Sequence, residues 1–221
     1  MQDFRASAEH FLQQWCDPDR KVNGKHPRYS ETDRSFVEQF SRDFTCSELN
    51  RFCVCYAVHR TIPGISDTTY SKYQAFVDML KRHRHTLVKR EQVPHFIGER
   101  VDEMAHHYGK RFLSAVTKAF WMLRQHPIVI VDSYACKALR RLGFPATEGE
   151  YSRYVESWLE LSGRPKESKE LSDALTWLPD SPASRSLQDR GIATSEEVRN
   201  WAKQPWFRDR VIDMYLWFAG N

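Results

Sequence analysis

Apolar residues recur at intervals of three and four along most of the chain, which is the period of an amphipathic α-helix. Phe36, Val37, Phe40 and Phe44 follow this spacing, and Ser30 or Thr32 could cap the start of their helix. The same pattern predicts helices near residues 47–60, from Thr68 or Thr69 onward, and near 95–108, 111–125, 132–142, 150–161, 169–178 and 195–218. No convincing pair of strands is present, so the sequence predicts an all-α fold.

The breaks between these segments suggest how the chain is divided. A short amphipathic piece, Phe4 to Trp15, is followed by a polar stretch that contains Pro18, Gly24 and Pro27. We therefore expect residues 1–30 to form an N-terminal arm and residues 31–221 to form one helical domain. Two subdomains, about 31–109 and 110–221, are the alternative division.

Composition narrows the class of protein. A chain of 221 residues can bury a continuous apolar core without a disulfide or a metal ion. The five cysteines are an odd number, and the longest apolar run, Ile128 to Val131, is far short of the roughly 20 residues that cross a bilayer. We expect reduced thiols, a cytoplasmic location and no membrane span. The net charge of +4 favours a polyanionic partner only if the basic residues share one face.

The candidate chemistry lies between residues 111 and 132. The helix predicted there is apolar around most of its circumference, and Lys118 lies at the edge of its narrow polar stripe. A lysine that is partly removed from water has a lowered pKa, so its neutral amine can act as a nucleophile. Asp132 follows the apolar run and precedes the next helix. The simpler interpretations are that Lys118 extends to solvent and that Asp132 only caps a helix.

Two segments resemble the helix-hairpin-helix DNA glycosylases, in particular bacterial proteins similar to 8-oxoguanine glycosylase. Thr117-Lys118, followed by Val131-Asp132-Ser133, resembles the lysine helix, loop and aspartate helix of that family. The stretch 210–217 resembles the closing helix, in which an aspartate precedes a Leu-Trp pair. The resemblance covers roughly residues 108–218. It departs from the family at 112–116, where the glycine-containing hairpin that presents backbone N–H groups to a DNA phosphate has no counterpart.

The resemblance implies a two-layer helical fold with a central cleft, and the excision of a damaged or modified base from double-stranded DNA without a cofactor. Lys118 would attack the glycosidic carbon of an extruded nucleotide, and Asp132 would stabilise the positive charge that develops on the sugar. A Schiff base formed in this way also permits strand cleavage. Aromatic side chains should hold the extruded base, and the candidates are Trp121, Tyr134 and Trp217.

Basic residues supply candidates for the contact with DNA. The densest run includes Lys81, Arg82 and Arg84, and Arg111, Arg140 and Arg141 lie near the proposed catalytic residues in the sequence. The alternative is that the run is a solvated helix end, where cations suit the helix dipole.

Two further alternatives concern function. Cys53, Cys55 and His59 do not share one helical face and no second ligand pair follows them, so we predict no metal site. The missing hairpin glycine favours a non-catalytic helical protein that binds nucleic acid or another protein on the same scaffold. A purely structural helical bundle would require Lys118 and Asp132 to lie far apart. The sequence predicts no particular oligomeric state.

Overall fold

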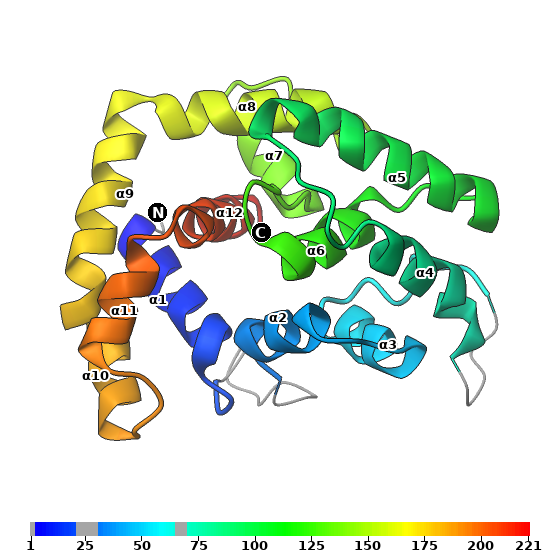
Figure 1. Ribbon diagram of the computed structural model, residues 1–221. Helices are drawn as coiled ribbons and strands as arrows, with labels where there is room; N and C mark the ends of the chain where they lie inside the picture. Colours follow the sequence, from blue (N-terminus) through cyan, green and yellow to red (C-terminus); the bar gives the residue numbers. More distant parts are fainter. Residues whose placement is uncertain (1–2, 21–30, 65–69) are drawn as a thin grey trace.

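A computed structural model describes residues 3–20, 31–64 and 70–221, and the described residues contain helices and no strands (Figure 1). In chain order the α-helices are α1 (Phe4–Cys16), α2 (Asp33–Ser41), α3 (Cys46–Cys55), α4 (Gln74–Arg82), α5 (Val93–Tyr108), α6 (Leu113–Arg124), α7 (Ser133–Arg141), α8 (Tyr151–Gly163), α9 (Pro165–Trp177), α10 (Pro182–Asp189), α11 (Ser195–Ala202) and α12 (Pro205–Gly220). Short 3₁₀ turns occupy Ser71–Tyr73, Arg90–Gln92 and Leu178–Asp180. The prediction of an all-α fold is confirmed.

Local signals explain most of the helix boundaries. Thr32 caps α2 by accepting a hydrogen bond from the backbone N–H of Ser35. Gly109 ends α5 in the left-handed region, at a φ of 69°, as expected for a residue that closes a helix. The helix predicted over 195–218 is two helices, because Pro205 starts α12 and cannot continue α11. The pattern missed α10, and Thr68 and Thr69 lie outside the described residues.

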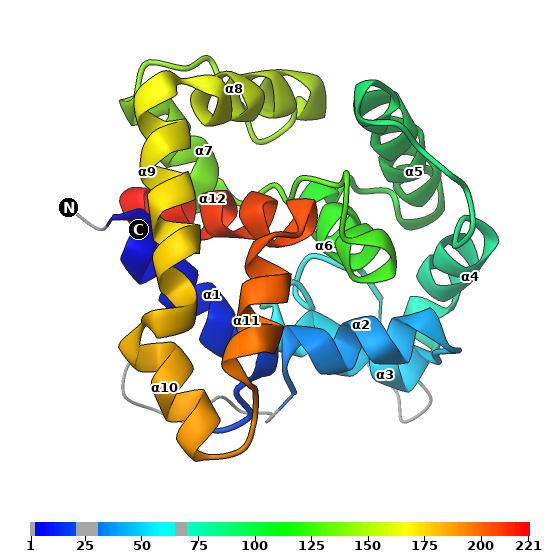
Figure 2. The ribbon, with the colours of Figure 1, turned by 60° about the vertical axis from the view of Figure 1, so that its left-hand side comes forward.

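The helix α12 runs through the middle of the molecule and packs against α7 and α1 (Figure 2). Its buried residues lie on every side, which a surface helix does not show. Gly220 marks the closest approach to α7, because a Cβ at this position would lie 1.8 Å from the carbonyl oxygen of Tyr134. Around this centre, α2 packs on α6, α1 packs on α9, and α5 packs on both α6 and α8.

The first helix is part of the core. Phe4, Ala8, Phe11 and Leu12 on α1 are at most 3% exposed, and α1 contacts α2, α9, α10 and α12. Within the expected N-terminal arm, α1 is therefore a packed helix. Its apolar face packs against helices that lie far from it in the sequence, namely α9, α10 and α12. Residues 21–30 of that arm lie outside the described residues.

No helix among the described residues is both long enough and apolar enough to cross a membrane.

Candidate functional site

The helix α6 and the extended segment that follows it bring Lys118 and Asp132 together. After α6 ends, residues 126–131 run back along it, and the backbone N–H of Val131 donates to the hydroxyl of Thr117 at 3.2 Å. Tyr154 on α8 holds the same segment by donating to the carbonyl of Ile130 at 2.9 Å. As a result, the Lys118 Nζ lies 3.2 Å from the Asp132 Oδ2.

Asp132 uses its two carboxylate oxygens for different partners. Oδ1 accepts a hydrogen bond from the backbone N–H of Tyr134 at 2.9 Å, which caps α7, and Oδ2 accepts one from Lys118. The capping interpretation and the ion-pair interpretation therefore both hold for this side chain. The cap also fixes the carboxylate, so the lysine meets an acid whose position is already determined.

Lys118 does not extend to solvent. Its side chain is only 12% exposed, and burial lowers the pKa of the amine below its ordinary value, while Asp132 opposes this effect by stabilising the ammonium form. The amine is therefore more easily deprotonated than a surface lysine. A buried amine beside one carboxylate can act as a nucleophile with a proton acceptor next to it.

Lys118 and Asp132 face a cavity of about 420 Å³, which we call the central cavity. Its volume lies in the range of about 300–1,000 Å³ that is typical of small-molecule sites. Residues from α1, α2, α3, α6, α7 and α12 and from the segments between helices line it. The lining comprises His10, Gln14, Arg20, Glu31, Asp33, Phe36, Cys55, Tyr56, Ala57, Lys118, Ile130, Asp132, Tyr134, Ala135, Arg210, Asp213, Met214 and Trp217.

A second hollow of about 360 Å³ shares the same pair of residues. Besides Lys118 and Asp132, it is lined by Lys110, Arg111 and Ser114 at the start of α6 and by Ser133 at the start of α7. Lys118 thus lines both a cavity that contains aromatic side chains and a hollow that contains basic ones.

The structure also reveals a buried charged cluster that the sequence analysis did not anticipate. Arg210 on α12 lies 3.7 Å from Asp33 at the start of α2 and 3.2 Å from Asp213 one turn further along α12. Tyr56 and Gln14 donate to Asp33, and the indole of Trp158 donates to Asp213 at 2.9 Å. We call Asp33, Arg210 and Asp213 the acid-rich cluster. Each is at most 5% exposed, and each lines the central cavity.

Burial changes the protonation of this cluster. It raises the pKa of Asp213 to about 7, although Arg210 and the Trp158 indole favour the carboxylate. Burial also raises the pKa of Tyr56 well above its ordinary value, so this side chain remains a phenol that donates to Asp33. The sequence offered one signal for the cluster: an Arg and an Asp one turn apart on a helix that is otherwise apolar.

Two of the three aromatic candidates line the central cavity. Tyr134 and Trp217 face it, and their ring centroids are 5.8 Å apart at an angle of 81°. Trp121 does not line it. That ring is fully buried in the core, 5.0 Å from the guanidinium of Arg210.

The six basic candidates are distributed over the molecule, and each has a partner in the structure. Only Arg111 lines a hollow that also contains Lys118. Lys81 pairs with Asp43 at 2.7 Å, Arg82 with Glu103 at 2.6 Å, Arg111 with Asp102, and Arg140 with Glu148 at 3.9 Å, while Arg84 donates to the carbonyl of Ser41 and Arg141 to that of Ala219.

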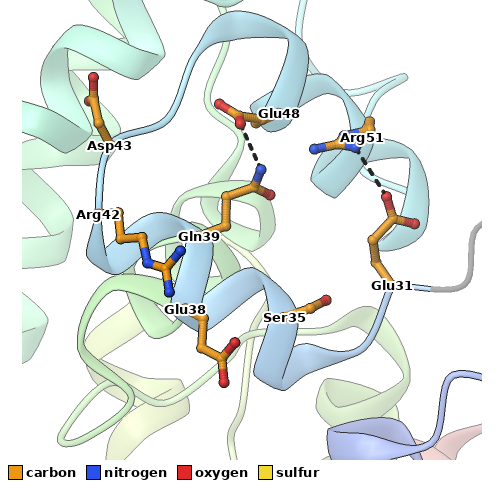
Figure 3. A pocket seen from close by; sticks show the side chains of 8 residues that line it. All are labelled: Glu31, Ser35, Glu38, Gln39, Arg42, Asp43, Glu48 and Arg51. Carbon is orange, nitrogen blue, oxygen red and sulfur yellow. Dashed lines mark hydrogen bonds and ion pairs between the residues drawn. The ribbon is translucent and has the colours of Figure 1, made fainter.

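A third hollow, between α2 and α3, has a volume of about 400 Å³ and is shown in Figure 3. Its side chains are mostly charged and partner one another, as in the ion pair of Arg51 with Glu31 at 3.5 Å and the hydrogen bond from Gln39 to Glu48. It contains neither Lys118 nor Asp132, so the proposed chemistry does not involve it.

The cysteines remain thiols. Burial raises the pKa of Cys55 to about 12 and that of Cys53 further still, so neither is a thiolate near neutral pH. Within the described part of the chain, no three His, Cys, Asp or Glu side chains are grouped so that they could hold a metal ion.

Comparison with known proteins gives no further assignment. No family model, curated protein or solved structure matches this chain.

Proposed function

We propose that this protein is a DNA glycosylase with associated lyase activity, and that its helices form the two-layer fold of the helix-hairpin-helix glycosylases around the central cavity. One observation carries the proposal: a buried lysine amine lies 3.2 Å from a fixed carboxylate at a cavity large enough for a nucleobase. A purely structural bundle was expected to hold Lys118 and Asp132 far apart, and their contact argues against it.

The chemistry follows from the two side chains. The nucleotide rotates out of the duplex because its glycosidic carbon cannot be reached while the base is stacked. The neutral amine of Lys118 then forms a bond to C1′ as the bond from C1′ to the base breaks, and the electron pair of that bond leaves with the base. Asp132 stabilises the positive charge on the sugar and accepts a proton from the new ammonium group.

The electron pair of the Lys118 nitrogen then forms the second bond to C1′ as the bond from C1′ to O4′ breaks, and O4′ takes up the proton held by Asp132. The product is a Schiff base between Lys118 and C1′ of the opened sugar. Loss of a proton from C2′ then allows the bond from C3′ to its phosphate oxygen to break, and the phosphate leaves with that electron pair. This step accounts for strand cleavage without any cofactor. Tyr134 and Trp217 supply aromatic surfaces against which the extruded base packs.

The second hollow is the proposed path for the DNA backbone. It joins the central cavity at Lys118, and it carries Lys110 and Arg111 beside the first turn of α6. Basic side chains and unpaired backbone N–H groups at a helix start favour a phosphate. In the sequence, these basic residues lie next to the segment at which the family has its glycine-containing hairpin and this chain does not.

The test is borohydride trapping of the Schiff base on duplexes that carry a panel of damaged or modified purines. We expect a covalent protein–DNA adduct with the wild-type chain and none with Lys118→Ala. Lys166→Ala is the matched control, because Lys166 is an exposed lysine on α9 that pairs with Glu170 at 4.0 Å and lines neither the central cavity nor the second hollow. Its adduct yield should equal that of the wild type.

Absence of both adduct and base release across the panel would remove the enzyme proposal. A salt-dependent gel shift without base release would then favour a nucleic-acid-binding role, because phosphate contacts weaken as salt increases. No shift would favour a protein-binding role.

A further inference from the structure

A hollow of about 480 Å³ lies where α9, α11 and the first turn of α12 meet (Figure 2), and we call it the cationic hollow. Three cations line it: Arg199 on α11, Lys203 directly after that helix, and Arg208 on α12. Among the described residues of its lining, none is acidic. Its volume lies in the range of about 300–1,000 Å³ that is typical of small-molecule sites.

The three cations have no counterion. Within residues 3–20, 31–64 and 70–221, no carboxylate pairs with Arg199, Lys203 or Arg208. Arg208 donates to the hydroxyl of Ser168 at 3.1 Å, which orients the guanidinium without neutralising its charge. The partial negative charge at the end of α11 is offset by the partial positive charge at the start of α12. The positive charge of the hollow therefore remains uncompensated.

The connection between α11 and α12 brings a helix start to the same place. Only Lys203 and Gln204 separate the two helices, so the first turn of α12 lies beside the last turn of α11. Pro205 occupies the first position of α12, and no described side chain caps this end. The backbone N–H groups of an uncapped helix start favour an anion, so they add to the attraction of the three side chains.

The opposite part of the lining is apolar. Leu175 on α9, Pro179 in the turn that follows it and Ala202 on α11 are buried and line the hollow. An inorganic anion would contact the cations and leave this surface in water. An organic group attached to the anion would cover it, and the removal of apolar surface from water stabilises the complex.

We propose that the cationic hollow binds a small organic phosphate monoester, with its phosphate at the three cations and its organic group against the apolar lining. A monoester carries about −1.5 to −2 charges near neutral pH and offers three acceptor oxygens, so each cation can reach one of them. Arginine is well suited to this contact, because its planar guanidinium matches the geometry of a phosphate. A phosphodiester has one charge and two free oxygens, and it satisfies the hollow less well.

This site is separate from the central cavity. The two share no described lining residue. At roughly 100° per residue, Arg208 is rotated around α12 by about 140–200° from Arg210, Asp213 and Trp217, and it therefore lies on the other side of the helix. The inference does not rest on the proposed function, because the excision of a base requires no ligand at this position.

The first experiment compares two esters that share one aromatic ring. Calorimetry at pH 8, in a buffer without phosphate, measures the binding of phenyl phosphate and of methyl phenyl phosphate, its diester counterpart. The wild-type protein should bind the monoester about 10-fold more tightly, the effect expected of one further hydrogen bond to a charged group. Equal or tighter binding of the diester would overturn the inference and favour a nucleic-acid backbone as the ligand. This comparison needs no variant.

Variants then locate the bound ester. Arg208→Gln and the double variant Arg199→Gln/Lys203→Gln should each weaken the binding of phenyl phosphate about 10-fold or more. Arg185→Gln is the matched control, because Arg185 is an exposed arginine on α10 outside the lining, and it should bind the ester as the wild type does. Unchanged affinity in the folded hollow variants would overturn the inference. Loss of binding in Arg111→Gln would also overturn it, because the ester would then occupy the second hollow.

The organic group is tested with inorganic phosphate. Phenyl phosphate should bind more tightly than inorganic phosphate, because its ring covers the apolar lining. Equal affinity for the two would overturn the assignment of an organic ester.

A short peptide that contains phosphotyrosine separates the two sources of a phosphate monoester, because its side chain carries the same phenyl phosphate group. Binding of the peptide that is no tighter than that of phenyl phosphate supports a free small ester. Clearly tighter binding of the peptide would overturn it in favour of a phosphorylated protein. None of these measurements contains DNA, so their failure would leave the proposed function intact, and absence of trapping would leave the cationic hollow intact.

Discussion

The two charged groups of the central cavity differ in how the chain assembles them. Lys118 and Asp132 are 14 residues apart in the chain. They meet because α6, the extended segment after it and the start of α7 follow one another directly in the sequence. Asp33 and Arg210 come from α2 and α12, near opposite ends of the chain. The first group balances its own charge and the second does not. In the proposed function the local pair therefore supplies the reactive groups, and the distant cluster lies buried at the same cavity.

The largest expected effect tests whether the acid-rich cluster is also a structural requirement. Arg210→Met leaves two buried carboxylates without their cation, and loss of one partner from such a group costs about 3–5 kcal/mol of unfolding free energy. Urea denaturation followed by tryptophan fluorescence measures this loss. Arg208→Met on the same helix is the control, because Arg208 is partly exposed and donates a hydrogen bond to the hydroxyl of Ser168 at 3.1 Å.

We expect Arg208→Met to change the unfolding free energy by no more than about 0.5 kcal/mol. If Arg210→Met were equally mild, the two carboxylates would have to be protonated in the folded protein, and the acid-rich cluster would not contain buried negative charge.

This contrast explains what the sequence could and could not predict. The period of the apolar residues identified most helices, and the resemblance identified Lys118 and Asp132, because both signals lie within short segments. Nothing local distinguishes Asp33 from an ordinary acid in the first turn of a helix. Its burial depends on the packing of α2 against α1 and α6 and on a guanidinium from the last helix. Such contacts are long-range, and periodicity does not report them.

Trp121 shows that local sequence signals also fail to tell a cavity-lining aromatic residue from a core residue. The sequence analysis named it with Tyr134 and Trp217 as a candidate for holding the base. A helix that is apolar on most sides points some of its aromatic residues into the core, and the ring packs there against Phe11 and Arg210. Tyr134 and Trp217 reach the cavity because the close contact of α7 with α12 positions both.

A smaller effect separates the two roles of Asp132. Asp132→Ala and Asp132→Ser both remove the partner of Lys118, but a serine can still accept the hydrogen bond that caps α7. We expect the serine variant to be more stable than the alanine variant by about 1 kcal/mol, the usual contribution of an N-cap side chain. Both variants should lose adduct formation to the same extent, because the lost carboxylate is common to them. Equal stability would mean that the cap contributes nothing measurable.

The smallest effect tests whether the two groups influence each other. The negative charge of Asp213 favours the ammonium form of Lys118, so Asp213→Asn should lower the pKa of the amine. The pH at which adduct formation is half-maximal, already below the ordinary lysine value of 10.5, should therefore move to lower pH, by less than about one unit. Asp173→Asn, at an exposed acid of α9 that pairs with Lys169, should leave it in place. A shift of the half-maximal pH to higher values would contradict the expected direction of the pKa change. An unchanged profile would mean that the charge of Asp213 does not affect the pKa of Lys118, although both side chains line the same cavity.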